Sequence, residues 1–261
     1  MSRIPPQQPR RGRARHNRKK RNWLRTILHL LILALAVEIV TLALTSPRFR
    51  IARIDVRGAK TIAAADVRAA ARFVIGANLF LADTGRVRRS VLKIPVVKEA
   101  RVGRRPMSWL VVRIKERTPC AVLHCGGKTY EIDSEGCAFR EARARARKLV
   151  GIELASRGRV RLGRKPYPEL VKSALDCLLE ARRKEFVVKK ISVDPADNMC
   201  LNMGSGLNVK LGRPIELKLK LSKLKDILIA KPEIASEALY VDLRCVTAPV
   251  WKRRQAVAPN P

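Results

Sequence analysis

Residues that commonly perform chemistry are scarce in this chain of 261 residues. Only three are histidines and only 4% are aromatic. The sequence contains no Gly-x-Ser-x-Gly, His-Glu-x-x-His or Cys-x-x-Cys motif, which are signatures of serine hydrolases, zinc proteases, and thiol-redox or zinc sites. Gly204-Ser205-Gly206 is predicted as a loop between strands, because no Lys-Ser pair or helix start follows it. We therefore predict no catalytic residue, no metal site and no cofactor.

Repeated sequence periods are also missing. Neither a Gly-x-y repeat nor a sustained heptad pattern occurs, which excludes a collagen or coiled-coil rod. The length leaves too few residues for a large outer-membrane barrel. Apolar residues make up 47% of the chain, enough for packed cores, so wholesale disorder is excluded. One membrane anchor and one or two modest domains fit these limits.

Acidic residues are few, with 22 Asp and Glu against 56 Lys and Arg, a formal net charge of +34. Nine of the basic residues, and no acidic one, lie within residues 1–22. This composition, with several prolines, predicts a disordered basic tail over residues 1–23.

One apolar run follows the tail. Residues 27–44 contain a single acidic side chain, and their number is close to the roughly 20 residues that cross a bilayer core. They predict a transmembrane helix over residues 24–45. A cleaved signal peptide is the alternative, although its apolar region is typically about 7 to 15 residues. The positive-inside rule places the tail in the cytoplasm and everything after Ser46 outside the cytoplasmic (inner) membrane.

The segment after the span keeps a strong positive charge, with 46 basic and 21 acidic residues, or +25. Exported proteins rarely meet nucleic acid, so we predict no nucleic-acid partner. Anionic lipid headgroups, anionic wall polymers and acidic proteins suit such a surface. The alternative is a composition that favours arginine without any ligand.

A polar stripe runs along the predicted span. A step of 100° per residue aligns Ala34, Glu38, Thr41 and Thr45 on one face. Small and polar residues on one face predict contact with another transmembrane helix. The alternative is a protonated Glu38 that a single-pass anchor tolerates.

The predicted fold class is α+β, with two domains after the span. Residues 47–118 predict the order β-α-α-β-β: a strand ending at Gly58, helices at 64–73 and 84–94, and strands at 96–102 and 110–114. Residues 119–250 predict a β-rich domain with two packed helices. Its predicted helices and strands are a hairpin at 121–132, helices at 168–183 and 215–229, and strands at 187–193, 198–203, 207–211 and 239–245. Residues 251–261 are predicted as a basic disordered tail.

Several motifs, in this order behind a basic tail and one span, resemble the FtsQ/DivIB family of bacterial cell-division proteins. They are IDVRG at 54–58, NLFLAD at 78–83, the segment 94–123, YEIDSEGCAF at 130–139, LNVKLG at 207–212 and LYVDLR at 239–244. The resemblance covers about residues 47–250 and departs at Cys245, where relatives tend to place an aromatic residue. It implies a POTRA domain over 47–118 and an FtsQ-type β-domain over 119–250.

The resemblance also implies a function. A protein of this kind is a non-enzymatic, single-pass scaffold of the divisome at the septum, whose partners are FtsB- and FtsL-like proteins and other divisome membrane proteins. It links cytoplasmic-side division proteins to septal wall synthesis. Two alternatives remain: a POTRA-bearing transport or outer-membrane assembly factor, and a membrane-anchored wall-modifying enzyme. The first needs repeated POTRA units or a barrel, and the second needs a nucleophile–base or metal set.

The last predicted strand, 239–245, is the candidate partner-binding edge. Alternation places Leu239, Val241, Leu243 and Cys245 toward the helices, and displays Tyr240, Asp242 and Arg244. Trp251 and the basic residues after it would then face an acidic partner segment. A partner strand could pair with this edge. The alternative is an edge protected only by charge and by Pro249.

The remaining candidates are structural. Six cysteines follow the span, so up to three disulfides are possible in an oxidising compartment, although their scatter also fits buried thiols. His124, at a hairpin edge, is predicted to be a spectator. Glu131, Asp133 and Glu135 could suggest a metal site, but their place around a tight turn predicts solvated turn residues.

Overall fold

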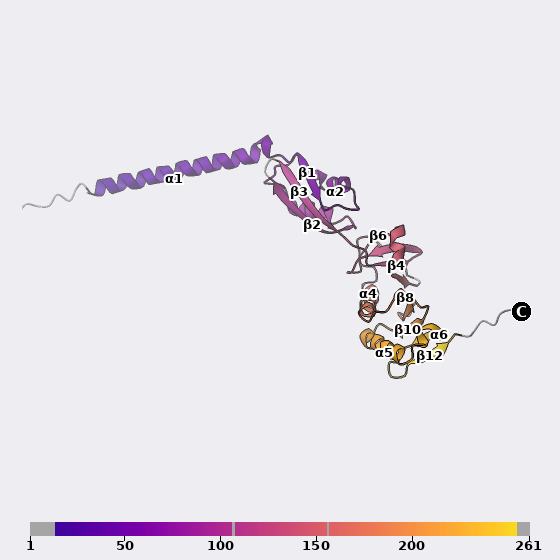
Figure 1. Ribbon diagram of the computed structural model, residues 1–261. Helices are drawn as coiled ribbons and strands as arrows, with labels where there is room; N and C mark the ends of the chain where they lie inside the picture. Colours follow the sequence, from indigo (N-terminus) through magenta and orange to yellow (C-terminus); the bar gives the residue numbers. More distant parts are fainter. Residues whose placement is uncertain (1–13, 106–107, 156, 255–261) are drawn as a thin grey trace, which may run out of the picture.

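The computed structural model describes residues 14–105, 108–155 and 157–254. Helix α1 (Ala14–Thr45) projects from the folded part as a single rod (Figure 1). Its segment Trp23–Thr45 is long and apolar enough to cross a membrane, and none of it is buried against the protein. The helix begins at Ala14, so residues 14–23 are helical where we predicted disorder. Arg and Lys have high helix propensity, and extending an existing helix is far easier than starting one.

The first domain has the predicted order β-α-α-β-β. Its elements are the short 3-10 helix η1 (Pro47–Phe49), β1 (Arg53–Arg57), α2 (Ala64–Ala71), η2 (Arg72–Val74), α3 (Thr84–Val91), β2 (Val97–Arg105) and β3 (Trp109–Glu116). The strands form a sheet in the order β1-β3-β2, with β1 parallel and β2 antiparallel to β3. Helix α3 begins as predicted, because the Asp83 carboxylate accepts a hydrogen bond from the Arg86 N–H.

One face of this small sheet is covered by the helices. Val67 of α2 and Val87 of α3 are fully buried against Leu110 and Val112 of β3. Apolar positions on both helices recur at helical spacing, so one stripe of each helix packs on the sheet. On the opposite face, Arg101 and Arg113 are exposed, whereas Val111 is only 5% exposed.

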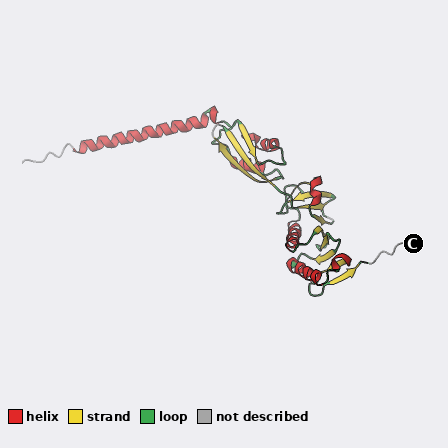
Figure 2. Cartoon of the chain, in the orientation of Figure 1, coloured by secondary structure: helices red, strands yellow, loops and turns green. Residues whose placement is uncertain are grey.

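The second domain is built on a single nine-stranded sheet (Figure 2). Its elements are β4 (Ala121–Cys125), β5 (Lys128–Ile132), β6 (Ala138–Glu141), η3 (Ala144–Lys148), β7 (Gly151–Leu154), α4 (Pro168–Arg183), β8 (Val188–Val193), β9 (Met199–Met203), β10 (Asn208–Gly212), α5 (Leu217–Ala230), α6 (Ile234–Glu237), β11 (Ala238–Asp242) and β12 (Val250–Arg253). The strand order is β12-β11-β10-β9-β8-β7-β4-β5-β6. The α+β class and the two packed helices are confirmed.

The two faces of the nine-stranded sheet differ in polarity. Ile191, Leu201 and Val209 lie on one face and are completely buried in a core that α4 and α5 complete. Their chain neighbours, such as Lys190 and Asn202, lie on the other face and are only half-buried. Because side chains alternate along a strand, this pattern leaves one face apolar and covered and the other polar and open.

Among the strands that escaped the sequence analysis are β7 and β12. β7 is four residues long, yet it pairs in parallel with both β4 and β8 and joins the two halves of the sheet. β12 contains residues 250–253, of which 251–253 were predicted as part of a disordered tail. It pairs antiparallel with β11. Both strands are too short for a period-2 pattern to stand out, and pairing with a neighbour defines them.

Two carboxylates at the junction of the domains are buried, which corrects the prediction that they are solvated. Glu131 and Asp133 are 1% and 2% exposed. The Arg140 guanidinium lies 2.6 Å from the Glu131 carboxylate, and the Arg117 guanidinium lies 2.5 Å from that of Asp133. Burying a carboxylate without a partner is costly, and each arginine offsets that cost for the carboxylate it contacts.

Contacts also cross from one domain to the other. Lys98 of β2 forms a 2.9 Å ion pair with Glu135 in the turn after β5. Arg140 of β6 donates to the Thr61 hydroxyl at 3.3 Å. Exposed pairs of this kind contribute little stability individually, but here they connect the edges of two rigid sheets.

Glu116, at the end of β3, is the carboxyl group at this junction whose pKa is most clearly shifted. Partial burial opposes its ionisation, but hydrogen bonds from the Thr61 hydroxyl and from the N–H groups of residues 60–62 outweigh it and lower the pKa to about 2. Because the folded pKa lies below the unfolded one, the ionised carboxylate stabilises the fold above about pH 4.5. This contribution is lost as the pH falls toward 2.

We expect Glu116→Gln to lower the free energy of unfolding by about 1 kcal/mol near neutral pH, a value reduced for solvent screening. The difference from the parent protein should vanish as the pH approaches the lowered pKa. Thermal unfolding of the full-length protein across that pH range measures it. Glu99→Gln is the control, because Glu99 only forms an exposed pair with Lys115. A Glu116 effect that does not change with pH would contradict the assignment.

Candidate interaction site at the sheet edge

The edge of the nine-stranded sheet is formed by β12, which corrects the predicted location. The strand predicted over residues 239–245 ends at Asp242 and lies between β10 and β12. After it, Leu243 donates its N–H to the Lys210 carbonyl, and the chain turns back to form β12. The segment expected at the edge is therefore one strand inside it.

Only two residues of the predicted apolar face of this strand are in the core. Val241 and Leu243 are almost fully buried, whereas Leu239 is exposed and Cys245 lies past the strand end and is exposed. An irregular register between Ala238 and Tyr240 shifts the alternation at the start of β11. Ala238 takes the buried position that Leu239 was expected to fill.

The four candidate partner-binding residues are divided between both faces of the sheet. Tyr240 and Asp242 are half-buried on the open face, where the Lys210 ammonium lies 3.8 Å from the Tyr240 ring centre. Arg244 lies beyond the strand and folds back onto Asp242, with a 2.7 Å ion pair. Hydrogen bonds from Arg244 hold the pKa of the Asp242 carboxyl below its usual value.

Trp251 lies on the opposite face from this polar group. It is the register partner of Val241, and directly paired residues project to the same side of a sheet. Trp251 therefore points toward the helices, with 37% of its surface exposed. Tyr240 and Asp242 can contact only a partner on the open face, and Trp251 only one on the helix side.

An apolar groove lies beside β12 on the helix side. It has a volume of about 240 Å³ and lies among the end of α5, α6, β11 and β12. Its lining residues are Ile227, Ala230, Lys231, Ile234, Val241, Pro249, Val250 and Trp251. The sequence analysis missed most of them, because they come from four elements that only the fold brings together. The groove could accept an apolar side chain from a strand added to β12.

The two edges of the sheet differ in whether other parts of the chain form hydrogen bonds with them. At the β6 edge, the Ala138 N–H donates to the Arg164 carbonyl at 3.0 Å, and its carbonyl accepts from the Gly163 N–H at 2.7 Å. At the β12 edge, no strand of the described ranges pairs with the outer side. An uncovered edge is a template for another strand. The sheet is therefore open to a partner at β12.

The main-chain hydrogen bonds between β12 and β11 determine which N–H groups of β12 face outward. The Arg254 N–H donates to the Glu237 carbonyl at 2.8 Å, toward β11. Amides alternate in direction along a strand. The Lys252 N–H therefore points to β11, and the Arg253 and Trp251 N–H groups point away from the sheet.

The stripe in the membrane span is present and exposed. The Thr41 hydroxyl donates to the Glu38 carbonyl at 2.8 Å, and the Thr45 hydroxyl to the Thr41 carbonyl at 2.7 Å. Both hydroxyl protons are therefore used within the helix. No hydrogen bond or ion pair reaches the Glu38 carboxyl from any described residue. Of the residues in the stripe, which includes Ala34, Glu38 has the side chain best able to bind a neighbouring helix.

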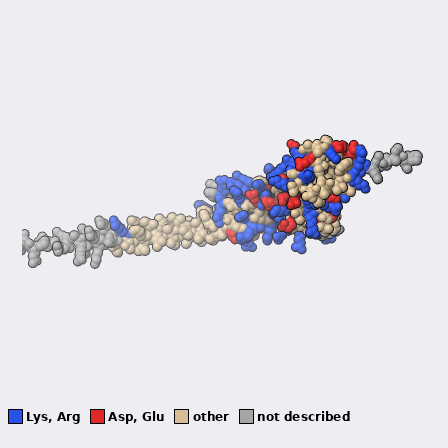
Figure 3. All heavy atoms as spheres, turned by 90° about the horizontal axis from the view of Figure 1, so that it is seen from below, with Lys and Arg blue, Asp and Glu red and all other residues tan. Residues whose placement is uncertain are grey.

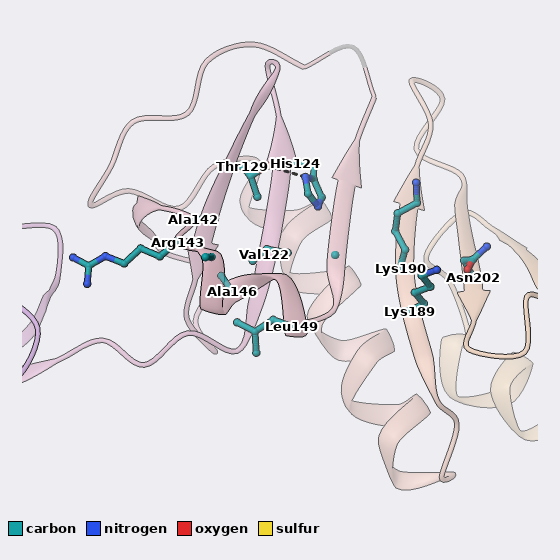
Figure 4. Close-up of a pocket in the computed structure, with 12 residues that line it drawn as sticks. Val122, His124, Thr129, Ala142, Arg143, Ala146, Leu149, Lys189, Lys190 and Asn202 are labelled. Atoms are coloured by element: carbon teal, nitrogen blue, oxygen red, sulfur yellow. Dashed lines mark hydrogen bonds between the residues drawn. The ribbon is translucent and has the colours of Figure 1, made fainter.

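A basic cleft lies on the open face of the second domain's sheet (Figure 4). Lys189 and Lys190 on β8 and His124 on β4 line it, and Arg143 extends away from the other labelled side chains. Gly151 of β7 also lines it. The lining contains no carboxylate and the volume of the cleft is about 700 Å³, but the Lys190 ammonium is already paired with the Glu153 carboxylate at 2.5 Å. His124 is paired with the Thr129 hydroxyl at 2.9 Å.

The cysteines, which are the other candidates for chemistry, are buried or half-buried except for Cys245, which is exposed. All six cysteines are free thiols in the structure, and burial raises the pKa of Cys177 to about 12. A thiol with so high a pKa is a poor nucleophile. Among the described residues, no group of His, Cys, Asp or Glu side chains is arranged to hold a metal ion.

Comparison with known proteins agrees with this architecture. A family model described as "POTRA domain, FtsQ-type" matches residues 49–117. The chain is 29% identical over 238 residues to cell division protein FtsQ of Streptomyces collinus, covering 85% of each chain. It is 27% identical over 259 residues to FtsQ of Streptomyces coelicolor, covering 93% of this chain and 94% of that one. Cell division protein DivIB of Clostridium tetani is 22% identical over 203 residues, covering 75% of this chain and 76% of its own.

The geometry of β12 predicts different effects for two neighbouring proline substitutions. Lys252→Pro should remove a ladder hydrogen bond and lower the free energy of unfolding by about 1–3 kcal/mol. Arg253→Pro should cost much less, because its amide points outward and its 2.6 Å ion pair with Glu237 is exposed. Thermal unfolding of the full-length protein in detergent measures both. The reverse order would show that the register of β12 is wrong.

Proposed function

Because the chain belongs to the FtsQ/DivIB family of bacterial cell-division proteins, we propose that it is a scaffold of the division complex that works by binding other single-pass membrane proteins. The names of its relatives support a role in cell division. In this proposal the protein has no enzymatic step. It links division proteins on the cytoplasmic side to septal wall synthesis on the other side.

One observation carries the proposal: β12 has an outer edge with no described strand beside it and an apolar groove next to it. A partner segment that added as a strand would satisfy the outward N–H groups of Trp251 and Arg253. Main-chain hydrogen bonds would provide affinity, and an apolar side chain in the groove would provide specificity. FtsB-like and FtsL-like proteins are the proposed partners, with other membrane proteins of the divisome.

Charge indicates which kind of segment fits. Lys252 and Arg253 of β12, and Arg254 directly after the strand, are all exposed. Of these, Arg253 is paired with Glu237. An acidic segment would therefore be attracted to this edge and oriented by it.

The membrane anchor adds a second contact. The apolar helix and the relatives indicate a single-pass membrane protein at the division site. In the proposed orientation the basic residues before the span lie in the cytoplasm, and both folded domains lie outside the cytoplasmic membrane. Glu38 would then meet the transmembrane helix of a partner inside the bilayer.

Strand addition can be tested with one matched pair of variants. Arg253→Pro removes the outward amide and the charge, whereas Arg253→Gln removes only the charge. Copurification of the full-length protein with a tagged FtsB-like partner should fall at least about tenfold for the proline variant, because outward main-chain hydrogen bonding is lost. It should fall only a few-fold for the glutamine variant.

The outcomes separate backbone pairing from charge attraction. Equal losses for the two variants would show that charge alone attracts the partner. Unchanged binding of Arg253→Pro, in protein that remains folded by the thermal measurement above, would remove β12 as the docking edge.

Glu38→Leu should weaken crosslinking between the span and partner spans severalfold, because a polar group in hydrocarbon is stabilised by a polar partner. Glu38→Gln keeps the hydrogen-bonding capacity and should retain most of the crosslinking. Val40→Leu, on the opposite face of the helix, is the control. Full crosslinking in Glu38→Leu would mean that the carboxyl is merely tolerated.

A further inference from the structure

The loop before α3, residues 75–82, is attached to the end of the membrane span. The Asn78 side-chain amide donates to the carbonyls of Ala43 and Leu44, both at 2.9 Å. These carbonyls belong to the last turn of α1, whose acceptors have no partner within the helix. Asn78 therefore caps the span and holds the loop directly at its end.

The rest of the loop is fixed just as firmly. Its backbone pairs with residues 49–51: the Ile51 N–H donates to the Ala77 carbonyl at 2.8 Å, and the Leu79 N–H to the Phe49 carbonyl at 2.7 Å. Arg104 donates to the carbonyls of Leu79 and Ala82, at 2.8 and 2.9 Å. The loop is therefore a rigid extension of the first domain.

This rigid loop displays apolar side chains. Phe80 is 52% exposed and Leu81 is 69% exposed, and their neighbours Leu79 and Ala82 are buried in the core. The centre of the Phe80 ring lies 5.2 Å from the centre of the Phe49 ring. A fixed backbone that presents large apolar groups outward is typical of an interaction surface.

Arginines adjoin this apolar surface in the chain, because Arg48 and Arg50 flank Phe49, whose ring lies against Phe80. Arg48 and Arg50 follow the span directly, and the Arg53 guanidinium lies 5.2 Å from the centre of the Trp109 ring. Lys and Arg side chains gather on the part of the molecule that adjoins the helix (Figure 3). Aromatic and basic side chains next to an apolar span are typical of proteins at the bilayer interface.

We propose that residues 75–82 dock on the bilayer surface, with Phe80 and Leu81 inserted at the boundary of headgroups and acyl chains and the neighbouring arginines bound to anionic lipid phosphates. The tie from Asn78 to the last turn of the span places the loop at the depth where the bilayer begins. Insertion removes the exposed apolar area from water. The docked loop sets the angle between the span and the first domain, and so the direction in which the β12 edge is presented.

Photocrosslinking tests this directly. The full-length protein carrying p-benzoylphenylalanine at position 81 is reconstituted into nanodiscs of phosphatidylcholine, with or without phosphatidylglycerol, and lipid adducts are measured by mass spectrometry. The control carries the probe at Ile215, which is 61% exposed and lies in the second domain just before α5, a helix that is far from α1 (Figure 1). We expect at least about tenfold more lipid adduct at position 81, and more with phosphatidylglycerol than without it.

Two results would overturn the proposal. Lipid adduct at position 81 no greater than at position 215 would place the loop in water. Adducts only with proteins, when the same variant is irradiated in native membranes, would make the loop a protein contact. Equal adduct in both lipid mixtures would overturn the role of anionic headgroups and leave insertion supported.

Discussion

Main-chain hydrogen bonding across the nine-stranded sheet is the constraint on which the second domain depends. β7 joins the two halves of the sheet through parallel pairing with β4 and β8. Helices α4 and α5 can cover one face only because that face is continuous. The ladder ends at β6, where residues 163 and 164 bond to Ala138, and at β12, where the described chain supplies no further strand. The main-chain groups on the outer side of β12 are therefore left without a strand of the described chain to bond to.

Part of the large positive charge is explained by structure. Arg117 and Arg140 neutralise two carboxylates that are buried at the domain junction. Lys220, 5% exposed, donates to the carbonyls of Leu211 and Arg213, and so fastens α5 to the end of β10. Exposed arginines such as Arg50 and Arg253 remain, one near the membrane and one at the sheet edge. Some of the basic residues thus serve as internal counterions, and others remain exposed on the surface.

The proposed scaffold role requires that the surfaces of the protein be held in fixed positions. The span fixes one end, Asn78 ties the first domain to that end, and ion pairs such as Lys98–Glu135 connect the first domain to the second. Each connection restricts the orientation of the next part. The β12 edge is thereby held at the far end of the molecule from the span (Figure 1), where the proposed partners would have to reach it.

The sequence alone was enough to predict the helices and turns whose own residues carry a clear pattern. The apolar run predicts the span, the helical spacing of residues 168–183 predicts α4 with the bounds that the structure has, and Gly126-Gly127 predicts the β4–β5 turn. Motifs were enough to indicate the family. Tertiary structure decided which strand forms the edge, because the four residues of β12 are a strand only through pairing with β11. It also decided that Glu131 and Asp133 are buried, and that Asn78 reaches Ala43. Each of these depends on partners supplied by residues distant in the sequence, which no local pattern can reveal.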